Sequence, residues 1–205
     1  MKIQRSGKPL CRFSYTHQGK TLYYDITSDS TVEVVNTDVS GDVVIPSTIP
    51  YNGTTYRVTS IGENAFYGCS GLTSVTIPNS VTSIGGSAFE NCRGLTSINV
   101  VLENAHYSSI DGVLYNYVQD TLIQCPGAKT SVAIPNSVTS IGEDAFSGCT
   151  GLTSVRCLAV TPPSIDNTSF YNVPTTCILT VPCGSIGAYT ESDWNEYFAG
   201  HISEE

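Results

Sequence analysis

A repeat of 23 residues is the feature that most limits how this chain can fold. The stretch that begins at Val58 reads VTSIGENAFYGCSGLTSVTIPNS, and the copy that begins at Val81 reads VTSIGGSAFENCRGLTSINV. The same string returns at Val138 as VTSIGEDAFSGCTGLTSV. Self-similarity at a constant period is typical of a solenoid, because one such unit buries its apolar side chains only by stacking on copies of itself.

The apolar positions within one copy predict short strands joined by tight turns. Leu72 to Ile77 ends in the alternation expected of a strand with one buried face, and Val58 to Ile61 is predicted to be a second short strand. Residues 63–68 are too few for an ordinary helix, so we expect a turn that carries Ala65 and Phe66 inward. Abundant Ser, Thr, Gly and Asn, with only 13% charged residues, favour the same interpretation.

Regions outside the regular repeat are predicted to close the two ends of the stack. Residues 1–57 hold β-branched segments, the hairpin signal Asn52-Gly53 and a partial repeat from about residue 43, which together indicate an N-terminal β cap. Residues 58–183 hold the repeats. Residues 184–205 are predicted to form a short helical C-terminal cap whose aromatic residues cover the last unit, namely Tyr189, Trp194, Tyr197 and Phe198.

Two units depart from the period. One expanded unit, at about 101–134, separates Val100 from Ile134 by 34 residues instead of 23. Within it, the segments 110–115 and 121–125 flank a polar turn, and we expect an antiparallel hairpin. The last unit is degenerate, since Phe146 maps to Phe170 with a step of 24 residues.

The pattern L-x-x-V-x-I-P followed by V-x-x-I-G-x-x-A-F-x-x-C resembles the BspA-like, or treponemal-type, leucine-rich repeat over residues 43–182. The resemblance implies a mainly β solenoid, a horseshoe-like relative of the α/β leucine-rich repeats with short turns instead of long helices. It also implies that the Leu72-type strands form a parallel sheet along one concave face. The expanded unit looks like a known variant in the family, and the end of the chain looks like that of gut-bacterial members.

The eight cysteines are predicted to be mainly core thiols. Cys69, Cys92 and Cys149 share one repeat position, so each is expected to point into its own rung and to pack as a small apolar group. A bridge between Cys69 and Cys92 is geometrically conceivable at the rung spacing of about 4.8 Å. A pair of Cys177 with Cys183 is the other alternative, and the disulfide state stays open for Cys11, Cys157, Cys177 and Cys183.

Charge and residue spacing weigh against several classes of function. The net charge is −9, and the nine Lys and Arg residues are scattered, so we expect no nucleic-acid binding. No two cysteines are separated by only two residues, which disfavours a zinc site, and no metal or cofactor is expected. No apolar run approaches the roughly 20 residues of a membrane span, and we expect no membrane insertion.

Candidate catalytic residues do not form a recognisable set. His17, His106 and His201 are far apart in the chain, and a nucleophilic pair of a repeat cysteine with His106 would need a thiol that is expected to be buried. Glu63 and the Glu143-Asp144 pair follow the Ile-Gly of their repeats, where solvated turns are expected. We therefore predict that the chain is not an enzyme.

The outward positions of the predicted sheet are the candidate ligand-facing residues. They are small hydroxyls and amides together with one arginine: Thr73, Thr76, Thr96, Asn99, Thr153 and Arg156. They are interpreted either as ordinary solvated strand residues or as a binding face. The expanded unit, with Tyr107, Tyr115 and Tyr117, is the competing site for a partner.

The resemblance implies an adhesion-type domain that binds a host extracellular-matrix or cell-surface protein, or a glycan. A structural spacer within a larger surface protein and a glycan-binding module are the alternatives. Residues 1–12 are polar and basic, with no apolar run of signal-peptide length, which leaves a cytoplasmic protein or an exported one without its signal. The resemblance favours the cell surface or the extracellular space.

Overall fold

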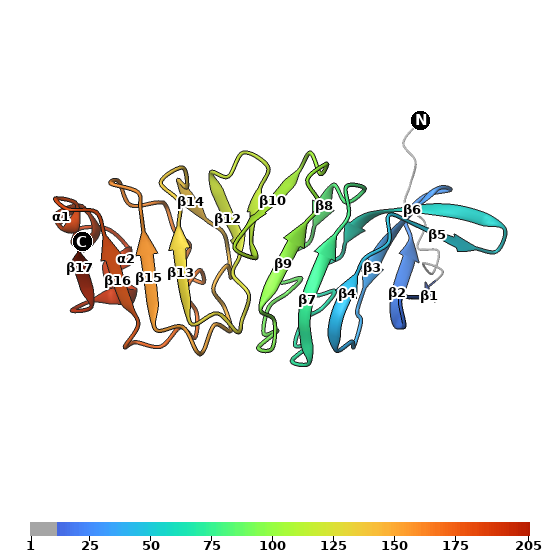
Figure 1. The fold of residues 1–205 in the computed structure, drawn as a ribbon, viewed down its shortest axis with the longest axis horizontal. Coiled ribbons are helices and arrows are strands. Elements are labelled where there is room, and N and C mark those ends of the chain that lie inside the picture. Colours follow the sequence, from blue (N-terminus) through green and yellow to red (C-terminus); the bar gives the residue numbers. More distant parts are fainter. Residues whose placement is uncertain (1–11) are drawn as a thin grey trace, which may run out of the picture.

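The computed structural model describes residues 12–205 and shows an elongated stack of short rungs (Figure 1). Strands dominate, and the two helices are only five residues long each. The predicted mainly β solenoid, with short turns in place of long helices, is therefore confirmed. None of the helices in these residues is long and apolar enough to span a membrane.

The elements follow one another from the N-terminal cap to the C-terminal cap. The cap and the first rungs contain β1 (Arg12–His17), β2 (Lys20–Ile26), β3 (Thr31–Val35), β4 (Gly41–Val44), β5 (Thr48–Tyr51), β6 (Thr54–Ile61), β7 (Leu72–Ile77), β8 (Ser83–Ile84) and β9 (Ser97–Val100). The remainder contains β10 (Tyr107–Ile110), β11 (Val113–Asn116), β12 (Thr121–Gln124), β13 (Ser131–Ile134), β14 (Ser140–Ile141), β15 (Ser154–Cys157), β16 (Ile178–Val181), α1 (Ile186–Thr190), α2 (Trp194–Phe198) and β17 (Ile202–Glu204).

One strand of each regular rung joins a parallel sheet, and we call the outward side of these strands the sheet face (β4, β7, β9, β13, β15, β16 and β17). In the first part, β4, β7 and β9 pair in parallel, with Thr76 beside Asn99. In the second part, β13, β15, β16 and β17 pair in parallel, with Ala133 beside Arg156 and Arg156 beside Thr180. The predicted parallel sheet is present, but it is divided into two after β9.

The N-terminal cap is made of strands, as the sequence indicated, and most of its strand pairs are antiparallel. β1 and β2 form a hairpin, β2 pairs with β3, and β3 pairs in parallel with β6. Asn52-Gly53 makes the tight turn between β5 and β6, and both residues have positive φ (48° and 80°). Arg12 donates to both oxygens of the buried Asp25 at 3.0 Å. β6 runs from this cap into the first repeat, across residues 57 and 58.

The turns between the strands stack on the side opposite the sheet face, which we call the turn face (residues 62–69, 85–92, 142–149 and 166–173). Phe66 N–H donates to the carbonyl of Ala88 at 2.8 Å, and Phe146 N–H donates to Ser169 in the same way. Gly85 lies where a Cβ would come within 2.4 Å of the Glu63 nitrogen, so a glycine is required for the turns to approach this closely.

Side chains of the turns and strands fill the interior. Ala65 and Phe66 are fully buried, as predicted. Phe66 stacks on Phe89 with ring centroids 5.3 Å apart, and Phe146 stacks on Phe170 at 4.7 Å. The four phenylalanines thus form two pairs, and the buried residues likewise form two clusters that meet at Val113 and Leu114.

The expanded unit explains this division. The predicted antiparallel pairing of residues 110–115 with 121–125 is present as β11 with β12. The extent of the first strand was wrong, because Asp111 and Gly112 are not strand residues. They form the turn of an additional hairpin between β10 and β11, with positive φ at both residues (50° and 76°). This hairpin lies between the β9 rung and the β13 rung, and it separates the two parts of the sheet.

The C-terminal cap combines the predicted helices with a strand that the sequence did not indicate. Tyr189, Trp194 and Phe198 are buried against the last rung, and the indole Nε1 of Trp194 donates to the Pro163 carbonyl at 2.7 Å. After α2, the chain returns as β17 and pairs in parallel with β16. The helices therefore cover the interior, and β17 extends the sheet by one strand (Figure 1).

The repeat cysteines are buried free thiols, as predicted. Each donates to a carbonyl of the preceding rung: Cys69 Sγ lies 3.0 Å from the Thr37 oxygen, and Cys92 Sγ lies 2.9 Å from the Phe66 oxygen. Neither Cys69 nor Cys92 is in a disulfide. Burial raises the pKa of the Cys92 thiol from 9.0 to about 12.

The cysteines near the C-terminus are also free. Cys157 and Cys177 are buried and Cys183 is exposed, so the alternative pair of Cys177 with Cys183 does not form. Burial raises the pKa of Cys177 to about 11. Cys11 lies outside the described residues.

Replacement of Phe89 by alanine is expected to lower the free energy of unfolding by about 3–5 kcal/mol, because it removes a buried ring together with the stacking contact that this ring makes with Phe66. Urea denaturation followed by circular dichroism measures this change. Tyr171→Ala on the same turn face, where the side chain is 58% exposed, is the control and should cost far less. Equal losses in the two variants would contradict the core assigned here.

Stability is expected to fall as the pH rises above about 9. In the unfolded chain Cys92 ionises near its ordinary pKa of 9.0, whereas in the folded chain it ionises near 12. Below pH 9 both states keep the proton; above it only the unfolded state loses the proton, which lowers the free energy of unfolding. Burial raises the pKa of Tyr24, Tyr115 and Tyr189 as well and adds to the fall.

Urea denaturation at about pH 8 and pH 10 tests this dependence. The loss for one such group reaches about 1.4 kcal/mol per pH unit. Cys92→Ala should be less stable at both pH values and should lose less on going from one to the other. An unchanged or rising stability of the natural chain would show that these groups are not buried in their neutral forms.

Candidate functional site

The six candidate residues all lie on the sheet face, but they fall into two groups. Thr73, Thr76 and Asn99 lie on strands of the first part of the sheet, and Arg156 lies on a strand of the second part. Thr96 and Thr153 immediately precede β9 and β15. Thr76 is half-buried and the other five are exposed. The single ladder expected from the sequence is therefore two separate groups, divided by the expanded unit.

Two of the predicted threonines use their hydroxyls inside the protein. Thr96 Oγ1 donates to the Thr73 carbonyl at 2.9 Å, and Thr153 Oγ1 donates to the Thr130 carbonyl at 2.9 Å. Each hydroxyl therefore links its own rung to the preceding one. Thr96 and Thr153 occupy the same position of their repeats and make the same hydrogen bond between rungs. This structural role explains why threonine recurs at the position, and no ligand is needed to explain it.

Thr73 is engaged by the acidic residue that precedes it on the sheet. Its Oγ1 donates to Asp42 Oδ1 at 2.6 Å, and Ser74 Oγ donates to the same oxygen at 2.7 Å. These two hydrogen bonds, with a smaller contribution from Lys20, hold the pKa of the Asp42 carboxyl below its ordinary value. The β4 end of the sheet face is therefore anionic.

Thr76, Asn99 and Arg156 direct their side chains outward from the strands. Thr76 and Asn99 are direct neighbours on β7 and β9. The Arg156 guanidinium donates to both carboxylate oxygens of Glu205, with Nη2 2.7 Å from Oε2. Since both groups are exposed, this pair is expected to add little to stability.

A polar cleft of about 440 Å³ lies where the sheet is divided. Its lining comes from the hairpin tip and from β13: Asp111, Val113, Lys129, Ser131, Val132 and Ala133. Lys129 Nζ donates to the Asp111 carbonyl at 2.6 Å and so links the two walls. Ala133 lies beside Arg156 on β15, so the cleft continues into the second part of the sheet face.

The competing aromatic site in the expanded unit is not assembled as expected. Tyr115 is fully buried in the second core cluster, where burial raises its pKa, so it cannot contact a partner. Tyr107 is half-buried, and only Tyr117 is well exposed, at 58%. Val113 and Tyr115 belong to the second core cluster and Leu114 belongs to the first, so β11 is buried on both of its faces and leaves no outward side for Tyr115.

Residues considered for catalysis lie apart from one another. His17 is at the end of β1, His106 in the loop after β9, and His201 immediately before β17. Glu63 and Glu143 are exposed in turns, and Asp144 accepts from Ser87 Oγ at 3.2 Å. Within residues 12–205, no three His, Cys, Asp or Glu side chains gather in a way that suits a metal ion.

Sequence reasoning missed the cleft and its lysine. Lys129 stands in no repeat motif, and its role depends on the position of the hairpin tip in space. The Asp111-Gly112 pair, which is a strong signal for a tight turn, is the feature that would have located the tip.

Thr153→Val is expected to lower the free energy of unfolding by about 1 kcal/mol, because it removes one hydrogen bond between rungs while the shape of the side chain is kept. Asn99→Ala is the matched control on the same face, and it should change stability by no more than about 0.5 kcal/mol. Both are measured by urea denaturation. A neutral Thr153→Val would remove the structural explanation for the threonines and leave a ligand-binding role.

Comparison with known proteins bears on this architecture. The family model described as "BspA type Leucine rich repeat region (6 copies)" matches residues 48–124 and 116–192. No curated protein sequence matches the chain. Solved structures with a similar chain path include leucine-rich repeat proteins from three bacteria.

The protein from Bacteroides capillosus ATCC 29799 is 23% identical, over 78% of this chain and 93% of that chain, with a TM-score of 0.42. The T. pallidum leucine-rich repeat protein is 25% identical, over 84% and 89%, also with a TM-score of 0.42. A leucine-rich cell surface protein from Faecalibacterium prausnitzii A2-165 is 17% identical, over 93% and 77%, with a TM-score of 0.41. Since these scores are low, the assignment depends on the repeats themselves. The family model matches most of the chain, and the chain belongs to the BspA-type leucine-rich repeat family.

Proposed function

We propose that this chain is a non-enzymatic recognition domain that binds a protein through its sheet face at the cell surface or outside the cell. The observation that carries the proposal is the sheet face itself. The strands of the sheet face lie on one side of the stack (Figure 1). Thr76, Asn99 and Arg156 are outward residues of three of these strands. A repeat scaffold of this kind provides an extended, rigid surface, and function depends on the side chains displayed on it.

The chemistry of the face suits a protein partner of moderate affinity. It is polar, because Thr76 offers a hydroxyl, Asn99 an amide and Arg156 a guanidinium, and each of these groups can form hydrogen bonds with a partner. It holds few of the aromatic and arginine side chains that anchor very tight interfaces. An adhesion-type contact, in which many copies or many domains act together, requires only such moderate affinity. A host extracellular-matrix or cell-surface protein is the proposed partner, and a glycan is the second candidate, since the same groups hydrogen-bond sugars.

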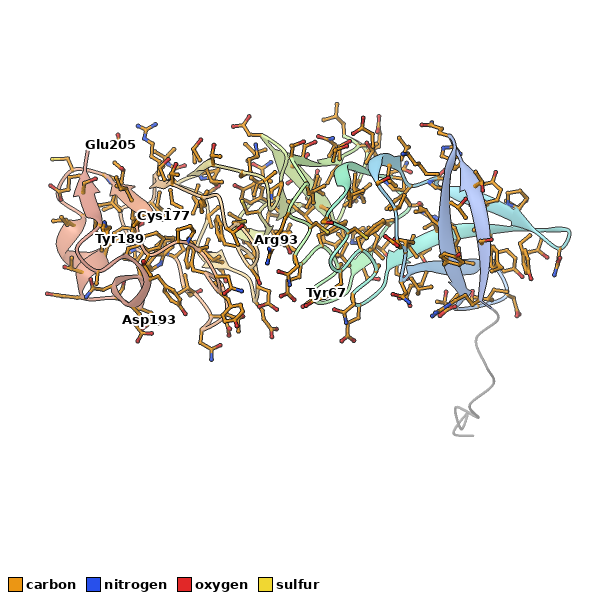
Figure 2. All side chains as sticks on the ribbon, turned by 90° about the horizontal axis from the view of Figure 1, so that it is seen from below. Tyr67, Arg93, Cys177, Tyr189, Asp193 and Glu205 are labelled. Atoms are coloured by element: carbon orange, nitrogen blue, oxygen red, sulfur yellow. The ribbon has the colours of Figure 1, made fainter. Side chains whose placement is uncertain are left out.

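Binding of the purified chain to an array of extracellular-matrix proteins and host glycans tests the proposal. The variant Thr76→Arg, Asn99→Arg, Arg156→Glu changes the sheet face without a change in net charge. The matched control, Tyr67→Arg with Tyr171→Glu, changes two exposed residues of the turn face and also keeps the net charge. Figure 2 shows Tyr67 projecting outward on the turn face.

Saturable binding to a protein that is lost in the sheet-face variant and kept in the control is the expected result. Binding that survives in the sheet-face variant would move the site elsewhere. Saturable binding to sugars alone would favour the glycan module, and no saturable binding would favour a spacer.

A further inference from the structure

The division of the sheet leaves β13 as an edge strand in the middle of the molecule. The order of its sheet is β13-β15-β16-β17, and no strand of residues 12–205 pairs with the other side of β13. The edge of β9 across the cleft differs, because the hairpin tip covers it. Ile98 N–H donates to the Gly112 carbonyl at 2.8 Å, and Val100 N–H donates to Ser109 Oγ at 3.1 Å.

The open edge of β13 presents its peptide groups to the cleft. The carbonyls of Thr130 and Ile134 accept hydrogen bonds from the two residues that flank β15, namely from the N–H groups of Thr153 and Leu158. Since alternate residues of a parallel strand turn their peptide groups to the same neighbour, Ser131 and Ala133 turn theirs to the other side. Both residues line the cleft. Unpaired strand edges of this kind are sites where an extended peptide adds as a further strand.

Basic side chains are few in this part of the molecule, and one of them lines the same cleft. Residues 58–205 contain only three basic side chains, Arg93, Lys129 and Arg156. Lys129 lines the cleft, and Arg156 lies on the strand next to Ala133. Arg93 lies beside Gly127, two residues before Lys129 in the chain, because a Cβ on Gly127 would lie 3.2 Å from the Arg93 Cα. Figure 2 shows Arg93 at the middle of the stack, seen from below.

Arg156 is held by Glu205, and Asp111 adds one carboxylate to the lining, so Lys129 is the positive charge of the lining and Arg93 lies close to its segment of the chain. Neither of them forms an ion pair within residues 12–205.

We propose that an extended acidic peptide segment of a partner protein adds as a strand to β13 in this cleft. Its main chain bonds the peptide groups of Ser131 and Ala133, its small side chains contact Val113 and Val132, and its carboxylates lie near Lys129. The other open edge of the same sheet, β17, carries Glu204, and Glu205 follows it, which repels such a segment. The inference rests on the proposed recognition function and names the part of the face and the class of partner.

A displayed library of short random peptides, selected on the immobilised chain, tests the inference. The selected peptides should be rich in Asp and Glu and should bind saturably when synthesised. Ala133→Pro removes the N–H that faces the cleft, and an edge strand tolerates proline at such a position. We expect about tenfold weaker binding, as for one lost hydrogen bond. Ala133→Ser keeps the N–H and should bind as the natural chain does.

Two further measurements separate strand addition from simple charge attraction. Lys129→Ala should weaken binding and reduce its dependence on salt concentration. Hydrogen exchange of the Ser131 and Ala133 amides should slow in the presence of the peptide. Thermal unfolding of each variant confirms that the domain is folded.

The inference is overturned if no peptide is enriched, if the selected peptides bind Ala133→Pro as tightly as Ala133→Ser, or if the two amides exchange at unchanged rates. Such a result, together with protein binding that the sheet-face variant loses, would leave the proposed function in place. A lack of saturable binding to any protein in the array would count against the proposed function itself.

Discussion

The backbone hydrogen bonds between successive rungs are the interaction on which the rest of the structure depends. On the sheet side each rung donates to carbonyls of the preceding rung, as from Thr96 to Thr73, and in the turns it donates to carbonyls of the following rung, as from Phe66 to Ala88. These bonds require the rungs to approach to about 4.8 Å. That spacing in turn requires glycine where one turn crosses another, stacked phenylalanines in the interior, and a small side chain such as cysteine below a carbonyl. The sequence repeats because every rung must meet these same requirements.

The common packing requirements of the rungs explain which features of the fold could be predicted from the sequence. The core positions, the thiols, the turns and both caps follow from local patterns, because each copy of the repeat solves the same packing problem, and the structure confirms them. The division of the sheet was not predicted, since it depends on where one hairpin lies between two rungs. Tyr115 was placed wrongly for a related reason: β11 lies between the two core clusters and is buried on both faces, which depends on the position of the expanded unit in the stack. β17 was missed because a strand of three residues between polar neighbours leaves no periodic signal.

The candidate site illustrates a general difficulty with repeat proteins. A residue that recurs at one position is conspicuous in the sequence whether it serves the scaffold or a ligand. Thr96 and Thr153 recur because their hydroxyls bridge rungs. The residues that distinguish this chain from an ideal repeat are those that do not recur, such as Lys129 and Arg156. In a repeat scaffold, the residues that are specific to one protein lie where the repeat is interrupted. The expanded unit is the largest such interruption in this chain.

The separation of the interior into two clusters also affects how the molecule varies in length. The caps pack on the rungs at the two ends of the stack, and the expanded unit packs on the rungs on either side of it. Gain or loss of one regular unit on either side therefore lengthens or shortens the face by about one rung spacing, near 4.8 Å, and leaves the two ends and the junction unchanged. The distance from the expanded unit to one end of the molecule can therefore change without a change in its distance to the other end. Duplication of one short segment of the gene is enough for such a change.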